Sequence, residues 1–316
     1  MGKILITGAL GYIGCNLVNY LAANKKNNIL ALDIGYFLKK KFKQKNVETI
    51  IKDIHQLKTR DLKNVSVVIH LAAISNDPSA LINSKLSWET NVLGTYKLLN
   101  LCKKIKIKKF IFASSGSVYG IKKENNVHED LDLFPITDYN KTKMVGEKVV
   151  ESFSKDFLTT IIRPATVCGF SESMRYDLTV NAMTFSALKK NSINVFGGPQ
   201  FRPNICMNDM LRVYEFFLKN NYEGIFNAGF ENYSINQIAN KIIKTLNFIK
   251  IKVKKNKSND IRSYRLDSSK IIKLGFVPQN KIEDIIYDLF MKFKNNQLFL
   301  KTENLRVKHL KRLIKK

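Results

Sequence analysis

The sequence predicts an α/β fold built on an open, doubly wound parallel sheet with helices on both faces. Two observations lead to this prediction. Short apolar runs alternate with segments of helical periodicity from residue 3 to about residue 164, which is the pattern of strands and crossover helices. The first strand also passes into the first helix through three glycines, a turn that such sheets use at their carboxyl edge.

The first unit consists of a strand at residues 4–6, a glycine turn and a helix at residues 13–21. The strand is an unbroken apolar run, as expected of a parallel strand covered on both faces. We expect Gly8 to permit the tight turn, Gly11 to let a diphosphate approach the backbone, and Gly14 to let the helix pack on the strand. The unpaired N–H groups at the start of the helix would face the anion.

The second strand, residues 29–32, ends at Asp33. An acid about twenty residues beyond the glycine turn is typical of a carboxylate that binds an adenosine ribose. Since a carboxylate would repel a 2′-phosphate, the sequence favours NAD over NADP. The alternative is that Asp33 is a loop or capping acid, because aspartate is common after any strand.

The third and fourth strands are predicted at residues 47–51 and 65–71. Asp53 and Ile54, which follow the third strand, could hold the amino group and the ring of an adenine. The small residues of His70-Leu71-Ala72-Ala73 could let a dinucleotide lie against the end of the fourth strand, or they could reflect tight packing alone.

A long helix is predicted at residues 84–105, with Asn91 within it, and the fifth strand at residues 109–113. The fifth strand leads into Ser114-Ser115-Gly116-Ser117-Val118-Tyr119-Gly120. Gly116 and the small hydroxyl side chains would allow a ligand to approach the carboxyl end of this strand, where open parallel sheets bind ligands.

Tyr139 and Lys143 are four residues apart on the next predicted helix and therefore share one of its faces. A free tyrosine has a pKa of about 10 and is a poor base at neutral pH. A nearby ammonium group and a positively charged nicotinamide would lower that pKa toward the useful range. Ser115 could donate a hydrogen bond to the substrate oxygen from which the tyrosine removes a proton. The alternative is a packed tyrosine beside a surface lysine.

The composition is that of a globular protein, with 45% hydrophobic residues among 316. The sequence begins almost directly on the first strand and has no apolar run as long as a membrane span. We therefore expect no signal peptide, no membrane partner and a cytoplasmic protein. The four cysteines form no CxxC pair and the four histidines show no ligand spacing, which predicts neither disulfides nor a metal site.

The formal charge of +27 is compatible with a nucleic-acid or membrane-surface protein. The lysines, however, are spread along the chain beside asparagine and isoleucine, as on solvated helix faces. We therefore expect no nucleic-acid partner, and a dedicated site for polyanions is the alternative.

Together these motifs resemble the extended short-chain dehydrogenase/reductase family, and within it the NAD-dependent nucleotide-sugar epimerases and dehydratases of the UDP-glucose 4-epimerase type. They occur in the family's order over residues 3 to about 290. The resemblance implies an enzyme that binds NAD. The motifs that carry it are Thr7-Gly8-x-x-Gly11-x-x-Gly14, Asp33, Asp53-Ile54, His70-Leu71-Ala72-Ala73, Asn91, Ser114-Ser115-x-x-Val118-Tyr119-Gly120 and Tyr139-x-x-x-Lys143.

Later segments are similar to the same family. In residues 163–169, Cys168 replaces the usual tyrosine, and in residues 202–209, Cys206 replaces a histidine. Arg202 would contact the diphosphate of a sugar nucleotide, to which a forked guanidinium is suited. The other two segments are residues 173–181, which resemble a subgroup of sugar-nucleotide oxidoreductases, and residues 260–264, in which an arginine would help to grip the nucleotide.

The resemblance implies a role for each matching residue. The catalytic residues would be Ser115, Tyr139 and Lys143. The residues expected to bind NAD are Gly8, Gly11, Tyr12, Ile13, Gly14, Asp33, Asp53, Ile54, Leu71, Ala72, Ala73, Asn91, Tyr139 and Lys143. Those expected to bind the substrate, a nucleotide-diphosphate sugar, are Ser115, Ser117, Arg175, Asn181, Arg202 and Arg262.

A division of the chain into two parts also follows from the resemblance. We expect a Rossmann domain that binds NAD and a smaller, discontinuous α/β cap that binds the substrate. The basic C-terminal tail is expected to form a peripheral amphipathic helix. The expected bounds are residues 1–167 and 206–230 for the NAD-binding domain, 168–205 and 231–300 for the cap, and 301–316 for the tail.

The mechanism that the resemblance implies begins with Tyr139 as the base that removes a proton from the sugar C4 hydroxyl, while the C4 hydride passes to NAD. The transient 4-keto sugar beside bound NADH then has three fates. The hydride returns to the opposite face in a 4-epimerase, water is lost in a 4,6-dehydratase, and the hydride goes elsewhere in a 4-dehydrogenase or reductase.

An Asp-Glu pair supplies the acid and the base in the related dehydratases, and Gly116 and Ser117 occupy those positions here. We therefore favour the epimerase, with a 4-dehydrogenase or reductase as the alternative. A non-catalytic dinucleotide- or polyanion-binding module is the alternative of a different class. Family members commonly dimerise through the helix at residues 84–105 and the helix that carries Tyr139, so a homodimer is expected.

Overall fold

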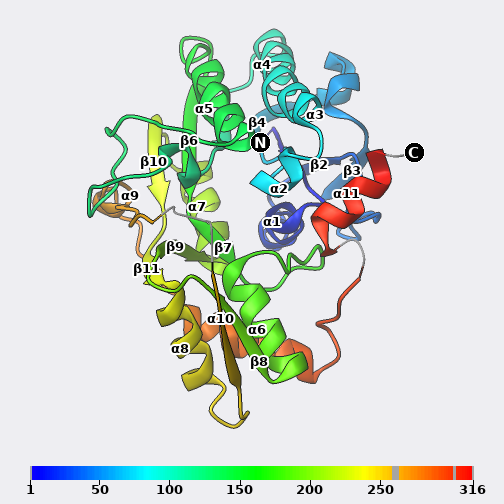
Figure 1. Cartoon of the computed structure of the whole chain (residues 1–316). Coiled ribbons are helices and arrows are strands. Elements are labelled where there is room, and N and C mark those ends of the chain that lie inside the picture. Colours follow the sequence, from blue (N-terminus) through cyan, green and yellow to red (C-terminus); the bar gives the residue numbers. More distant parts are fainter. Residues whose placement is uncertain (1, 258–262, 302–303, 315–316) are drawn as a thin grey trace.

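A seven-stranded sheet forms the centre of the computed structural model, which describes residues 2–257, 263–301 and 304–314 (Figure 1). The strands are β1 (Lys3–Thr7), β2 (Ile29–Asp33), β3 (Val47–Ile51), β4 (Val65–His70), β5 (Lys109–Ala113), β6 (Leu158–Pro164) and β10 (Gly224–Ala228). Their order is β10-β6-β5-β4-β1-β2-β3, and every neighbouring pair is parallel. The order reverses beside β1, so the carboxyl ends of β1 and β4 flank a topological switch point. The predicted doubly wound α/β fold is confirmed.

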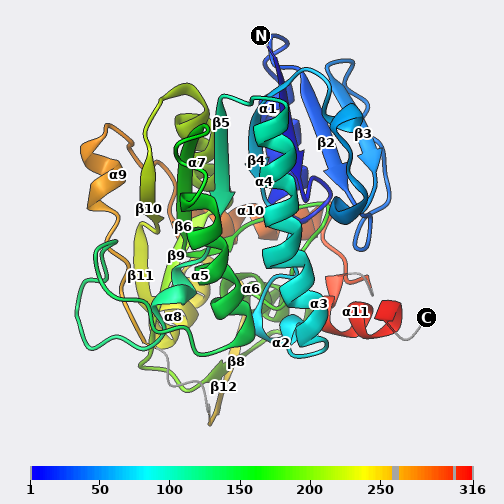
Figure 2. The same cartoon turned by 90° about the horizontal axis from the view of Figure 1, so that it is seen from above.

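Helices cover both faces of the sheet. Strand β1 shows why both faces are apolar, because Ile4 and Ile6 belong to one core and Leu5, which points the other way, belongs to a second. The flanking helices are α4 (Gly94–Lys104) and α5 (Asp138–Glu151) on one face, and α1 (Tyr12–Ala22) and α7 (Met207–Lys219) on the other (Figures 1 and 2).

The helix predicted at residues 84–105 is present, but it is not a uniform α-helix. α3 (Ser84–Trp88) continues through a π-helical turn, Glu89–Leu93, into α4. The Asn91 amide in this turn forms hydrogen bonds with both the N–H and the C=O of Ile74, at 2.8 and 3.1 Å. A π-helical turn inside an α-helix is often found beside a functional site.

Smaller sheets and helices from the second half of the chain lie at the carboxyl edge of the central sheet (Figure 2). Three of their strands form one sheet and two form a parallel pair. The predicted division into an NAD-binding domain and a cap stays a prediction. These elements are β7 (Thr166–Cys168), β9 (Phe201–Cys206) and β11 (Glu231–Ser234), the pair β8 (Ser192–Phe196) and β12 (Lys252–Asn256), and the helices α6 (Thr179–Lys190), α8 (Ile235–Thr245) and α10 (Ile282–Lys294). Helix α9 (Ser269–Lys273) lies beside the edge strand β10 (Figure 2).

The C-terminal segment forms the expected amphipathic helix, α11 (Arg306–Ile314), at the edge of the molecule (Figure 1). Its apolar face is buried, because Leu310 is 1% exposed and α11 packs against α2 (Asp77–Ala80). The sequence pattern does not specify this partner helix.

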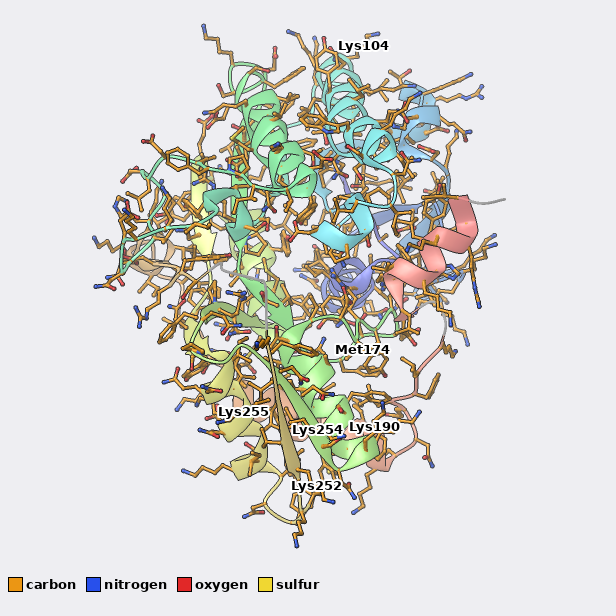
Figure 3. All side chains as sticks on the ribbon, viewed as in Figure 1. Lys104, Met174, Lys190, Lys252, Lys254 and Lys255 are labelled. Carbon is orange, nitrogen blue, oxygen red and sulfur yellow. The ribbon has the colours of Figure 1, made fainter. Side chains whose placement is uncertain are left out.

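Basic side chains are widely separated over the molecule. Figure 3 labels Lys104 at the end of α4, and Lys190, Lys252, Lys254 and Lys255 around β8 and β12 at the opposite end. Among the helices that the structure describes, none is long and apolar enough to span a membrane.

Candidate active site

A cavity of about 700 Å³ opens at the carboxyl ends of β1, β2, β4 and β5. It is lined by segments from both halves of the chain. The residues of the predicted site that line it are Gly8, Gly11, Tyr12, Ile13, Gly14, Asp33, Asp53, Ile54, Leu71, Ala72, Ala73, Ser115, Ser117, Tyr139, Lys143, Arg175 and Arg202.

The glycine turn is built from backbone contacts that leave no room for side chains. Gly8 has a φ of +68°, and a Cβ atom there would lie 2.7 Å from the backbone nitrogen of Ala72. A Cβ atom at Gly14 would lie 2.1 Å from the carbonyl oxygen of Gly8, so α1 packs directly on the turn. Gly11 is the N-cap residue of α1 and provides no capping side chain. The first N–H groups of α1 are therefore suited to an anion.

The carboxylate of Asp33 is held at the end of β2 by two backbone donors. Leu10 N–H donates to Oδ2 at 2.9 Å, and Gly35 N–H donates to Oδ1 at 2.7 Å. Burial raises the pKa of this carboxyl, while the backbone donors and the charge of Arg306 act in the opposite direction. Asp33 thus stabilises its loop and also lines the cavity, so the two alternatives for this residue are compatible.

Asp53 has a capping role as well. Its Oδ1 accepts the N–H of His55 at 2.8 Å, at the start of the short 3₁₀ helix Ile54–Gln56. The cap positions both Asp53 and Ile54 in the wall of the cavity.

Tyr139 lies in the first turn of α5. Burial raises the pKa of its phenol to about 12, while the charge of Arg175 and a hydrogen bond with Ser115 lower it. Arg175 is thus a second cation that favours the phenolate. The expected role of Lys143 stays a prediction, and its ammonium donates a hydrogen bond to the carbonyl oxygen of Ala113 at 2.7 Å.

Lys143 is held between α5 and β5. Its side chain is 4% exposed, and Nζ lies 4.9 Å from the centroid of the Phe112 ring. Burial lowers the pKa of this ammonium to about 8, and the charge of Glu147 opposes the shift. The ammonium is thus fixed in the wall of the cavity, on the same helix as Tyr139.

The hydroxyl of Ser115 is oriented by its neighbours. Its Oγ lies 2.7 Å from Oγ of Ser117, whose hydroxyl donates to Oδ1 of Asn140 at 2.6 Å. This chain of hydrogen bonds connects the loop after β5 to the first turn of α5.

Arg175 lies in the segment between β7 and α6. It forms an ion pair with Asp177 at 2.6 Å, and the Asn76 amide donates to the same carboxylate at 2.6 Å. The pair is partly enclosed, with the arginine side chain 12% exposed. Arg175 therefore has a fixed position from which its charge reaches Tyr139.

Arg202 lies in β9, and its Nη1 donates to the carbonyl oxygen of Phe201 at 3.0 Å. It lines the same cavity as the predicted catalytic residues. Arg262 lies outside the described residues.

Two predicted ligand-binding residues do not line the cavity. Asn91 uses its amide on Ile74 and on Thr142, whose Oγ1 accepts a hydrogen bond at 2.9 Å. Asn181 is fully buried, accepts the N–H of Gly169 at 3.0 Å and donates to the Tyr12 hydroxyl at 2.9 Å. Their hydrogen bonds join segments of the cavity wall to one another.

Several lining residues were not predicted from the sequence. Tyr36 and Phe37 closely follow Asp33, and that proximity is a signal that could have identified them. Nothing in the spacing of the tail identifies Arg306. The lining residues that sequence reasoning missed include Tyr36, Phe37, Tyr214, Tyr264 and Arg306.

Residues 4–229 match the NAD dependent epimerase/dehydratase family. The chain belongs to this family. It is therefore an NAD-dependent enzyme, as the resemblance of its motifs predicted, and it is related to nucleotide-sugar epimerases and dehydratases.

Two curated relatives illustrate the similarity. An uncharacterised UDP-glucose epimerase of Bacillus subtilis is 32% identical over 225 residues, which are 66% of this chain and 70% of the relative. A putative UDP-glucose 4-epimerase of Methanocaldococcus jannaschii is 28% identical over 302 residues, which are 93% of this chain and 99% of the relative.

Solved structures are similar over almost the whole chain. A UDP-glucuronic acid 4-epimerase from Bacillus cereus, in complex with UDP-glucuronic acid and NAD, has a TM-score of 0.83 and 27% identity. The match covers 93% of this chain and 99% of that one.

The residues of the cavity fit NAD on chemical grounds. The glycines of the turn have no side chains, so a ligand can come close to their backbone. The N–H groups at the start of α1 suit a diphosphate. Asp33 offers a carboxylate to a ribose and opposes a 2′-phosphate. Among the residues that the structure describes, none forms a hydrogen bond with Nε or Nη1 of Arg306.

Proposed function

We propose that this enzyme is a 4-epimerase that acts on a nucleotide-diphosphate sugar. The observation that carries the proposal is the presence of Ser115, Tyr139 and Lys143 in one cavity, with Gly116 and Ser117 where a dehydratase would hold its Asp-Glu pair. These two residues supply neither an acid nor a base for the loss of water. Names of relatives and neighbours that describe UDP-sugar 4-epimerases support the proposal.

Tyr139 would accept the proton of the C4 hydroxyl on its phenol oxygen. Bound NAD supplies the acceptor and the later donor of a hydride. Ser115 would donate a hydrogen bond to the C4 oxygen, with its hydroxyl held by Ser117 at 2.7 Å. Arg175 would favour the phenolate through its charge. In an epimerase Tyr139 would return the proton after the sugar has presented its opposite face.

Arg202 would bind the diphosphate of the substrate, since a guanidinium can donate two parallel hydrogen bonds to it. Arg175 and Ser117 are proposed as further substrate contacts, and Arg262 keeps this role as a proposal from its sequence motif. For Asn91 and Asn181 we propose an indirect role, in which they position the segments that contact the ligands.

The experiment that tests the proposal is incubation of the purified protein with UDP-, GDP-, CDP- and dTDP-sugars, with product stereochemistry followed by NMR and NADH by absorbance. Inversion at C4 without net NADH is expected. Accumulation of NADH with a 4-keto sugar would make the enzyme a 4-dehydrogenase. A 4-keto-6-deoxy product would make it a dehydratase, and either result would overturn the proposal.

A further inference from the structure

The start of the C-terminal helix lies in the wall of the NAD cavity. Arg306, Val307 and Leu310 of α11 all line it. In Figures 1 and 2, α11 lies beside α2 although most of the chain separates the two helices in sequence. The tail is therefore part of the site.

The tail is anchored by contacts to two loops. Nε2 of His309 lies 2.7 Å from the carbonyl oxygen of Tyr36, in the loop after β2. The Asn304 amide donates to the carbonyl oxygen of Met174 at 3.2 Å, in the segment between β7 and α6 (Figure 3). The second loop also carries Arg175, so the tail bridges the predicted ribose end of the cavity and the segment beside Tyr139.

The guanidinium of Arg306 is buried with only part of its hydrogen-bonding capacity used. Arg306 is 5% exposed. Nη2 donates to the carbonyl oxygen and the hydroxyl of Ser173, and the guanidinium carbon lies 4.0 Å from the centroid of the Phe37 ring. Within the described part of the chain, Nε and Nη1 have no hydrogen-bond partner. A buried cation with unused donors is costly unless an anion joins it.

Within residues 2–257, 263–301 and 304–314, the charges around Arg306 do not neutralise it. Asp33 and Asp177 attract it, but Asp33 is bound by two backbone N–H groups and Asp177 pairs with Arg175. Burial and the like charge of Arg175 lower the pKa of Arg306 to about 9. The buried guanidinium of Arg306 and the partly enclosed one of Arg175 repel each other beside one cavity, which favours a bound anion between or beside them.

We propose that Arg306 binds the diphosphate of NAD and completes the anion site that begins at the N-terminus of α1. The nicotinamide dinucleotide is favoured over the substrate because the Arg306 guanidinium lies over the Phe37 ring and His309 of the same helix contacts the carbonyl oxygen of Tyr36. Tyr36 and Phe37 lie in the loop that follows Asp33, the predicted ribose carboxylate. Nε and Nη1 would donate to phosphate oxygens, and α11 would act as a strap that slows release of NAD.

The test compares Arg306→Gln with Arg312→Gln, an exposed arginine on the same helix. Calorimetric titration of the full-length, nucleotide-free protein would measure affinity for ADP, adenosine and UDP. Arg306→Gln is expected to weaken ADP binding at least about tenfold, the usual scale for a hydrogen bond to a charged group, and to leave adenosine binding unchanged. Arg312→Gln is expected to change neither.

Other outcomes would overturn the proposal. Equal loss of ADP and adenosine binding would indicate a structural role for Arg306, and unchanged ADP binding would exclude it from the diphosphate site. Loss of UDP binding alone would assign it to the substrate. If Arg306→Gln does not fold, the test uses Arg306→Lys. This variant is expected to bind adenosine with unchanged affinity and ADP about threefold more weakly, because an ammonium lacks the forked donors. Unchanged ADP affinity would again refute the proposal. These readouts measure binding, so they are independent of whether the enzyme epimerises a sugar.

Discussion

The basicity of Tyr139 depends on more side chains than the tyrosine and lysine of its motif. Burial is the largest influence on the phenol and raises its pKa to about 12. Arg175, which lies in a segment far along the chain, and Ser115 act in the opposite direction. A nearby cation and a hydrogen-bond donor both favour the phenolate, so residues from three separate segments determine the pKa of the Tyr139 phenol.

Substitution Tyr139→Phe should remove the base without removing the ring. We expect kcat to fall at least about a hundredfold, the usual scale for loss of a general base, while NAD binding persists. Turnover of the sugar identified in the panel and the NAD content of the purified variant would be measured. Tyr287→Phe, on the exposed face of α10, serves as the matched control, and near-normal turnover in Tyr139→Phe would remove Tyr139 from the catalytic role.

Substitution Arg175→Gln should move the pH dependence of the reaction. A phenol that loses a neighbouring positive charge becomes harder to ionise, so its pKa rises and the ascending limb of the kcat/KM profile moves to higher pH. At neutral pH we expect a loss of about tenfold, since one pKa unit corresponds to a factor of ten. Arg202→Gln is the control, expected to raise KM without moving the limb. An unmoved limb in Arg175→Gln would contradict the role of its charge.

Residues in local motifs were predictable, and residues held by distant packing were not. Gly8, Asp33 and Tyr139 follow from spacing along one strand, turn or helix, and all three line the cavity. The role of Asn181 depends on the hydroxyl of Tyr12 and the N–H of Gly169, which the fold alone brings to it. The position of Arg306 likewise depends on where the tail packs.

At the scale of whole elements, a buried ion pair fastens α5 to β6. Arg163 binds Glu147 through two bonds of 2.9 and 2.7 Å, and the two side chains are 3% and 1% exposed. The Ser114 hydroxyl donates to the same carboxylate. Because α5 carries Tyr139 and Lys143, this pair fixes the position of both residues relative to the sheet.

Removal of one partner of this pair should lower the free energy of unfolding, and removal of both charged groups together should restore most of it. Arg163→Met leaves a buried carboxylate unpaired, and we expect it to lower the free energy of unfolding by about 3–5 kcal/mol. The double variant Arg163→Met/Glu147→Leu should recover most of the loss. Urea unfolding would measure both. Lys148→Met, which removes the exposed pair between Lys148 and Glu151, should cost less than about 1 kcal/mol, and an equal cost for both single variants would contradict a special role of the buried pair.

Elements were predictable where one periodicity dominates. The strands predicted at residues 29–32, 47–51 and 109–113 are β2, β3 and β5, because their apolar or alternating runs are short and bounded. The π-helical turn was not predictable, because it accompanies the bonds between Asn91 and Ile74 rather than any local pattern.

In the whole molecule, the central sheet was predictable from the sequence, but some of the connections between distant segments were not. The strand–helix alternation gives the parallel sheet, but only the structure shows that residues 224–228 return as its edge strand and that α11 reaches the cavity. We propose the division into an NAD-binding domain, residues 1–167 and 206–230, and a cap, residues 168–205 and 231–300. The cavity lies where the two proposed parts meet, which explains why it is lined from both.

The outer surface of the helices beside α5 suggests that two copies of the chain associate. Leu93 and Tyr96 are three residues apart on one helix face and are 57% and 52% exposed, and adjacent exposed apolar side chains are typical of an interaction surface.

We expect light scattering at micromolar concentration to give twice the chain mass of 36.3 kDa. The pair Leu93→Asp/Tyr96→Asp should yield monomers, since unpaired charges in an interface are strongly unfavourable. Tyr287→Asp, on α10 at the opposite side of the molecule in Figure 1, should remain dimeric. A monomeric mass for the unmodified protein would refute the dimer, and a dimer that survives the double substitution would move the interface elsewhere.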